Sequence, residues 1–209
     1  MVVALVPLVV ALATVAPASG AAVPLRCSTS GGTVVSNGAA RVFSRTRRRR
    51  YHGHRTRVTA FYACLRADRR VFRLRKSFGG PLLDTPGACG EHAWLPRLSV
   101  RYASFVHAGC DSHSVEISVG DLAARRVSFD VDLGEDVDPV DCEVSSEGAV
   151  AWVDDADDAV MKADGEGTAQ IGRADNGRIG IRGTTLSWRE GGAVRTYRLV
   201  GAAPPDLSR

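Results

Sequence analysis

The chain has 209 residues, of which 44% are hydrophobic and 24% are charged. This composition excludes a disordered chain and is ordinary for a folded protein, with enough residues for one domain with a substantial core or two small ones. The formal net charge of +4 is modest, so any strong electrostatic function must come from the distribution of the charges.

The N-terminal segment is typical of a secretory signal. Residues 2–15 are apolar apart from Pro7 and Thr14, and Ala16-Pro17-Ala18 matches the small-residue cleavage pattern. We therefore expect a signal peptide at 1–18, a mature chain that begins near Ser19 and a flexible segment at 19–32. A buried first strand is the alternative. No second hydrophobic span follows, so we expect no transmembrane anchor after signal removal and a secreted or cell-envelope protein.

Short alternating strands make up the predicted domain at 33–200, followed by a tail at 201–209. Asn37-Gly38 is a two-residue hairpin signal, and Gly191-Gly192 is predicted as the last hairpin turn. Residues 115–119 and 127–133 alternate with a period of two. The acidic stretch 154–158 lacks the spaced pattern of a calcium loop and is predicted as a turn. No stretch of twelve residues has helical periodicity, so we expect an all-β fold.

Four apolar stretches each carry one large aromatic residue. Taking Tyr62, Phe105, Trp152 and Trp188 as equivalent anchors, the steps between them are 43, 47 and 36 residues. A four-strand unit that recurs at this spacing is typical of blade-like antiparallel β repeats. The sequence therefore predicts a partial or small β-propeller, with a β-sandwich as the alternative.

A resemblance supports the same fold. The stretches 41–43, 62–66, 148–153 and 186–192 resemble those of uncharacterised exported proteins of GC-rich Gram-positive bacteria with TolB- or WD40-like β-propeller-type repeats. The resemblance spans about residues 33–200 and rests on strand and turn residues. It implies an all-β domain of four or five blade-like sheets and implies no chemistry.

Five cysteines predict two disulfides and one free thiol in an oxidising compartment. Cys89-x-x-His92 and His107-x-x-Cys110-x-x-His113 have the spacing of a zinc site. We expect a Cys89–Cys110 disulfide instead, because oxidation removes the thiolates that zinc would need. The alternative function is a secreted hydrolase or metal-dependent enzyme that uses the His92, His107 and His113 loops. We assign no catalytic residue, metal ligand or cofactor.

The basic charge is concentrated in one run. Between Arg26 and Lys76 there are fifteen basic residues and one acid, and the densest part holds Arg45, Arg47, Arg48, Arg49, Arg50, Arg55 and Arg57. Its charge density predicts a solvated loop or strand edge. We expect this segment to bind a polyanion, which makes the protein a non-enzymatic binding module of the cell envelope that contacts an anionic polymer or a protein. Nucleic acid is not expected, because Tyr51 is the only aromatic residue in the run.

An alternative arrangement of the charged regions would prevent the binding of a polyanion. Residues 130–166 hold fourteen acids and one base, Lys162. If this acidic region folds against the arginine run, the two charges neutralise each other inside the molecule. If it does not, the molecule is strongly dipolar.

Overall fold

The computed structural model describes residues 26–28, 31–51, 54–79, 92–108, 114–135 and 137–202. These residues form fifteen antiparallel strands in four small sheets and no helix. The prediction of an all-β fold is therefore confirmed. Within these ranges there is accordingly no helix long and apolar enough to cross a membrane.

Each sheet is a meander whose strands lie side by side in chain order. The first sheet contains β1 (Gly32–Ser36), β2 (Ala40–Tyr51), β3 (His54–Leu65) and β4 (Val71–Gly79). The second contains β5 (His92–Leu98), β6 (Tyr102–Ala108), β7 (Ser114–Asp121) and β8 (Arg126–Glu135). The third contains β9 (Pro139–Val144), β10 (Val150–Asp154), β11 (Ala159–Asp164) and β12 (Gly167–Arg173). The last contains β13 (Ile179–Arg182), β14 (Thr185–Glu190) and β15 (Ala193–Arg198).

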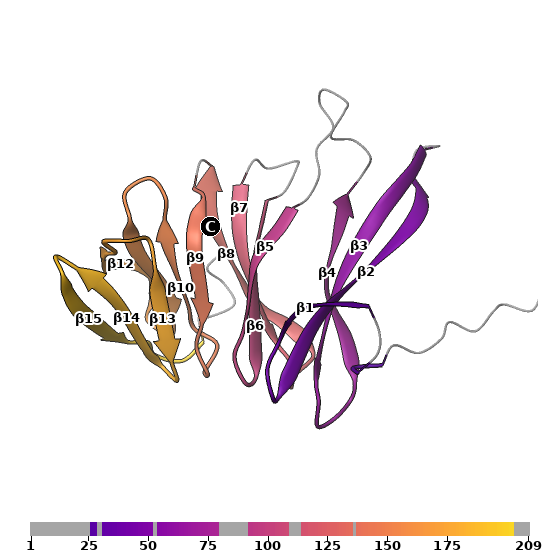
Figure 1. Ribbon diagram of the computed structural model, residues 1–209, viewed down its shortest axis with the longest axis horizontal. Helices are drawn as coiled ribbons and strands as arrows, with labels where there is room; N and C mark the ends of the chain where they lie inside the picture. The colour runs from indigo at the N-terminus through magenta and orange to yellow at the C-terminus, as the bar shows by residue number, and fades with distance from the viewer. Residues whose placement is uncertain are drawn as a thin grey trace, which may run out of the picture.

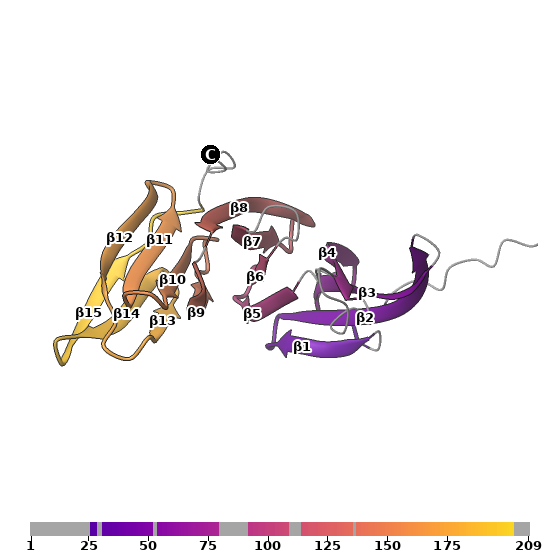
Figure 2. The ribbon, with the colours of Figure 1, turned by 90° about the horizontal axis from the view of Figure 1, so that it is seen from above.

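The four sheets follow one another in a row (Figure 1). Seen from above, the row is open, with the first and last sheets at opposite ends (Figure 2). This serial arrangement of four sheets differs from the two facing sheets of the sandwich that was the alternative. It also shows no closed ring among the described residues.

The core is divided into layers between successive sheets, and three of the four predicted anchors lie in these layers. Phe105 on β6 stacks on Phe61 of the first sheet, with ring centroids 6.5 Å apart. Trp152 on β10 packs against the second sheet, and Trp188 on β14 packs against the third. Each of these three rings is buried, lies on the second strand of its sheet and faces the preceding sheet.

The fourth anchor, Tyr62, was placed wrongly. Tyr62 lies on β3, the third strand of its sheet, and stacks on Phe43 with ring centroids 5.4 Å apart. This pair lies on the outer face with Cys27 and Cys64, away from the second sheet. Two strands, β1 and β2, precede Tyr62 in its sheet, whereas one strand precedes each of the other three anchors.

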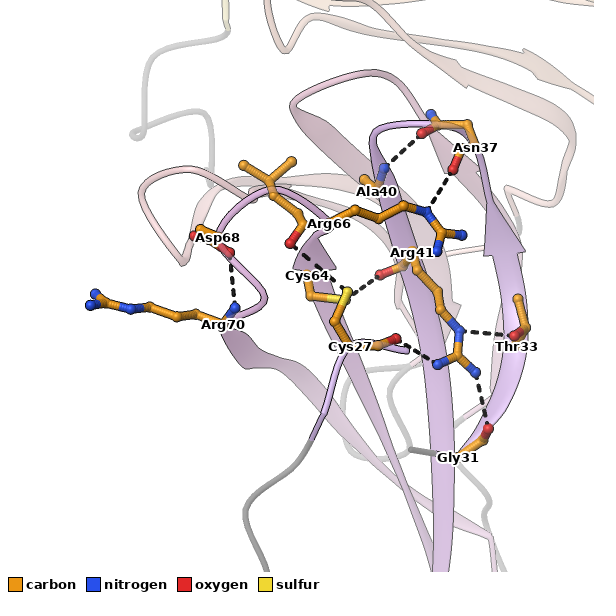
Figure 3. Close-up of a disulfide and its surroundings, with 11 residues drawn as sticks. Cys27, Gly31, Thr33, Asn37, Ala40, Arg41, Cys64, Arg66, Asp68 and Arg70 are labelled. Carbon is orange, nitrogen blue, oxygen red and sulfur yellow. Dashed lines mark hydrogen bonds between the residues drawn. A yellow bond between two sulfur atoms is a disulfide. The ribbon is translucent and has the colours of Figure 1, made fainter. Parts of the chain in front are cut away.

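The outer faces at both ends of the row differ from the apolar layers between the sheets. On the last sheet, β14 buries Leu186 and Trp188 inward and leaves Arg189 exposed, and β15 is exposed along most of its length. On the first sheet, the Cys27–Cys64 disulfide and the buried Arg41 hold the segment around Cys27 against the sheet (Figure 3). In the described part of the chain, the outer face of the first sheet is thus covered by the segment around Cys27, and the outer face of the last sheet is mostly exposed.

Candidate polyanion-binding site

The arginine run forms the end of a long β-hairpin between β2 and β3. The two strands pair without a register shift from Ala40 opposite Leu65 to Tyr51 opposite His54. Strand β1 pairs with β2 only as far as Ser44, so beyond that point β2 has β3 as its one neighbour among the described strands. The predicted strand edge is therefore present, and this part of the hairpin lies at the end of the row that is away from the last sheet (Figure 1).

The register places four arginines on one face of the hairpin. Arg48 lies opposite Arg57, and Arg50 lies opposite Arg55. Residues two apart on a strand share a face, so all four side chains point to the same side. All four are exposed. We call Arg48, Arg50, Arg55 and Arg57 the arginine face.

Two directly opposed like-charge pairs are unfavourable in a sheet. Cβ atoms of opposed residues lie about 4.5 to 5.5 Å apart, well within a Debye length of about 8 Å at physiological salt. The fields of the four guanidinium groups therefore add. A bound polyanion would relieve this repulsion, whereas an alternating pattern of acids and bases would have avoided it.

The other arginines of the run lie outside this face. Arg45 lies opposite Ala60 and Arg47 opposite Val58, so both belong to the opposite face of the hairpin. Arg45 is half-buried and Arg47 is exposed. Arg49 lies opposite Thr56, and its side chain is outside the described part. The strand register thus places the arginines of one continuous run on two opposite faces of the hairpin.

In the described part of the chain, the acids of residues 130–166 form ion pairs with other residues than those of the arginine face. Asp141 and Glu143 of β9 pair with Arg97 of β5, at 2.8 and 2.9 Å. Burial raises the pKa of Glu143, and the hydrogen bond from Arg97 offsets this only in part. Within the described ranges no acidic side chain forms an ion pair with any residue of the arginine face. The dipolar arrangement is therefore the one that these contacts support.

Further acids of the second and third sheets are also paired locally. Lys162 contacts Asp164 at 2.7 Å and Glu166 at 3.4 Å. Arg101 pairs with Asp121 at 2.6 Å. These ion pairs lie within single sheets, so they stabilise the sheets and leave the charge of the hairpin unchanged.

The Asp121 carboxylate can be used to measure how much one of these local ion pairs stabilises the fold. It accepts hydrogen bonds from Arg101 and from the backbone N–H groups of Ala123 and Ala124. Burial alone would raise the pKa of Asp121, but these hydrogen bonds outweigh it and hold the pKa below its usual range. A carboxyl with a depressed pKa stabilises the fold above its unfolded pKa and loses that contribution as pH falls through the folded value.

We expect Asp121→Asn to lower the free energy of unfolding by about 1 to 2 kcal/mol at neutral pH. Chemical denaturation from neutral pH down to about pH 2 should show the difference from wild type shrinking as the wild-type carboxyl becomes protonated. Asp132→Asn, whose exposed carboxylate accepts one bond from Gly134, is the control. A loss that stays constant over the whole pH range would show that the charge of Asp121 is not responsible.

The residues of the alternative, enzymatic site are only partly described. Cys89, Cys110 and His113 lie outside the described residues, so the predicted Cys89–Cys110 disulfide stays a prediction. His107 was predicted in a loop but lies in β6 and is 2% exposed. His92 begins β5, where Ala93 and not His92 lies opposite His107.

His107 nevertheless takes part in a polar cluster that the sequence did not reveal. Its Nε2 atom lies 2.8 Å from the hydroxyl of the buried Ser118, and that hydroxyl donates to Asp130. In a hydrolase triad the imidazole lies between the serine and the carboxylate, so that it can accept the serine proton. Here the serine lies in the middle and donates to the carboxylate. The cluster is therefore not a catalytic triad.

The disulfide that the structure does describe joins Cys27 to Cys64. It fits an oxidising compartment, as predicted for an exported chain. Cys142 is the free thiol among the described cysteines, and its complete burial raises its pKa to about 12. Such a thiol stays protonated at neutral pH and is unreactive.

No protein-family model, curated protein or solved structure matches this chain. The assignment of the candidate site therefore rests on the geometry of the arginine face.

Proposed function

We propose that the protein is an exported, non-enzymatic β module that binds an anionic polymer of the cell envelope through the arginine face. The observation that carries the proposal is the register of the hairpin, which aligns four exposed guanidinium groups without an acidic partner among the described residues. Arginine suits this function because its planar guanidinium binds phosphate or sulfate with two parallel hydrogen bonds.

The four serial sheets support a binding module of the blade-like kind. Each sheet is a meander, and the second strands of three sheets place an aromatic ring toward the preceding sheet. We infer that these sheets are blade-like units in an open array. In such an array the hairpin extends from one end unit, where a long polymer can reach it without entering a pocket.

The experiment measures binding of the full mature chain to heparin and to a poly(glycerol phosphate) as a function of salt. Four phosphate or sulfate contacts should lower the affinity by on the order of 100-fold between about 50 and 200 mM salt, because each neutralised contact releases counterions. Arg48→Ser/Arg50→Ser/Arg55→Ser/Arg57→Ser should bind at least tenfold more weakly at low salt and with a shallower salt dependence.

One control matches this variant in charge, and a pair of double variants compares the two faces of β2. Arg178→Ser/Arg182→Ser/Arg189→Ser/Arg198→Ser removes the same charge from exposed arginines at the other end of the row and should bind like wild type. Arg48→Ser/Arg50→Ser should weaken binding more than Arg45→Ser/Arg47→Ser, which changes the opposite face of the same strand. Equal binding by wild type and the hairpin variant would mean that the hairpin is only solvated. Tighter binding to duplex DNA than to either polymer would contradict the proposed class of partner.

A further inference from the structure

A second group of polar side chains converges on the second sheet, far in sequence from the arginine run. His107 on β6 lies opposite Glu116 on β7, and Ser118 on β7 lies opposite Asp130 on β8. Three neighbouring strands thus contribute to one face. His107 lies next to Phe105, with ring centroids 5.6 Å apart, and Phe105 faces the first sheet. The cluster therefore continues the inner face of the second sheet beyond its apolar layer.

The polar atoms of the cluster point to one position. The Nε2 atom of His107 lies 3.3 Å from Oε2 of Glu116 and 2.8 Å from the hydroxyl of Ser118. One ligand atom each from His107, Glu116 and Asp130 lies within 4.8 Å of the other two. In the described part of the chain this is the one group of three or more such side chains that meets this condition.

We propose that His107, Glu116 and Asp130 form a binding site for a divalent transition-metal ion, with Zn²⁺ as the ion that fits best. One imidazole nitrogen and two carboxylate oxygens are a ligand set that zinc accepts, leaving a fourth position for water. Bonds of about 2.0 Å in a tetrahedral arrangement place the ligand atoms about 3.3 Å apart. The His107–Glu116 separation already has this value, and a ligand atom of Asp130 lies within 4.8 Å of both.

The environment of the three ligands suits a bound cation. His107 is fixed by burial, so its ring loses little freedom when an ion binds. Glu116 is half-buried and Asp130 is accessible to solvent, which leaves a path for the ion. The hydroxyl of Ser118 donates to Asp130 and orients that carboxylate, as outer hydrogen bonds do in other metal sites. Two carboxylates beside one imidazole also carry net negative charge, which a divalent ion neutralises.

This site shares His107 with the zinc site considered from the sequence, but its other ligands are carboxylates. That site takes its thiolates from Cys89 and Cys110, whereas this one contains nitrogen and oxygen ligands only. Two carboxylates and an imidazole bind zinc without a reduced thiol, so the site is compatible with an oxidising compartment. The metal site also shares no residue with the arginine face, so an experiment can contradict one proposal without contradicting the other.

The test is calorimetric titration of Zn²⁺ into the full chain after removal of metals by a chelator. Wild type should bind one equivalent, with a rise in Tm of several degrees at saturating Zn²⁺. Asp130→Asn and Glu116→Gln should each weaken binding at least tenfold. Asp68→Asn, which removes the same charge from an exposed turn of the first sheet, should leave the affinity unchanged. Affinity should fall as pH drops below about 6, because a protonated imidazole cannot bind the ion.

Cobalt distinguishes the two possible ligand sets. Co²⁺ bound to His107, Glu116 and Asp130 should give visible d–d absorption without the intense near-ultraviolet band of a thiolate ligand. A thiolate band would place the ion on cysteines and overturn the proposal. Absence of Zn²⁺ binding by wild type, or equal affinity in wild type and the accessible Asp130→Asn variant, would overturn it as well.

Discussion

Trp152→Ala is expected to lower the free energy of unfolding by about 3 to 5 kcal/mol. Trp152 is 3% exposed and lies at the centre of β10, where it packs into the layer between the second and third sheets. Its neighbours there include Ile117 and Val131 of the second sheet. Removing the indole leaves a cavity between two sheets, and both would have to shift to fill it.

Chemical denaturation of wild type and Trp152→Ala under identical conditions measures this loss. Val194→Ala is the control, because Val194 is 66% exposed on β15 and its truncation should change the free energy by less than about 0.5 kcal/mol. A loss below about 1 kcal/mol for Trp152→Ala would show that the layer between these sheets does not depend on this ring.

Removal of the Cys27–Cys64 disulfide is expected to cost about 4 kcal/mol. The bond closes a loop with a sequence separation of 37 residues, and chain-entropy arguments give this value for a loop of that length. The disulfide holds the segment around Cys27 against the first sheet (Figure 3). On this outer face Cys27 and Cys64 pack with Phe43.

The hydrogen bonds of Arg41 cannot by themselves hold the segment around Cys27 in place when the disulfide is absent. Its guanidinium donates to the carbonyl oxygens of Cys27 and Gly31, at 2.7 and 3.1 Å, and to the hydroxyl of Thr33 at 2.9 Å. These contacts require the segment to be already in place, so they weaken once the disulfide is absent. The buried guanidinium then loses its acceptors, which adds to the cost.

The measurement compares Cys27→Ala/Cys64→Ala with Cys89→Ala/Cys110→Ala in chemical denaturation without reductant. Hydrogen exchange should show that the first variant loses protection mainly in β1–β4 and keeps it in β13–β15, because the sheets contact only their neighbours in the row. Unchanged stability in the first variant would contradict the assignment. Peptide mapping of the wild-type chain without reductant tests the predicted Cys89–Cys110 bond.

Local sequence signals predicted turns and strands correctly where residues close together in the chain determine the structure. Asn37 forms the first hairpin turn because its side chain accepts from the backbone N–H groups of Ala39 and Ala40. Gly191 and Gly192 form the last turn because both adopt positive φ, of 60° and 79°, which glycine tolerates. The period-two alternation near Val115 likewise predicted a strand, and its apolar residues Ile117 and Val119 are buried in the layer toward the third sheet.

The arginine run was harder to interpret, because charge density and strand pairing give opposite signals. Seven arginines in thirteen residues favour exposure, and exposure is typical of loops. Arg48 and Arg50 are indeed exposed, yet they lie in a strand because their backbones pair with β3. The misplacement of Tyr62 has a different origin, since spacing along the chain does not show how many strands precede an aromatic residue in its sheet.

The all-β class, the positions of the main turns and the separation of basic from acidic residues could be predicted from the sequence, because these properties depend on residues close together in the chain. The pairing of Cys27 with Cys64, the shared face of Arg48 and Arg50 with Arg55 and Arg57, and the contact of His107 with Glu116 and Asp130 became known from the fold. Each of these contacts depends on strand register and on which sheets are neighbours. A shift of one residue in register would turn every one of these side chains to the other face, and composition and spacing do not encode that choice.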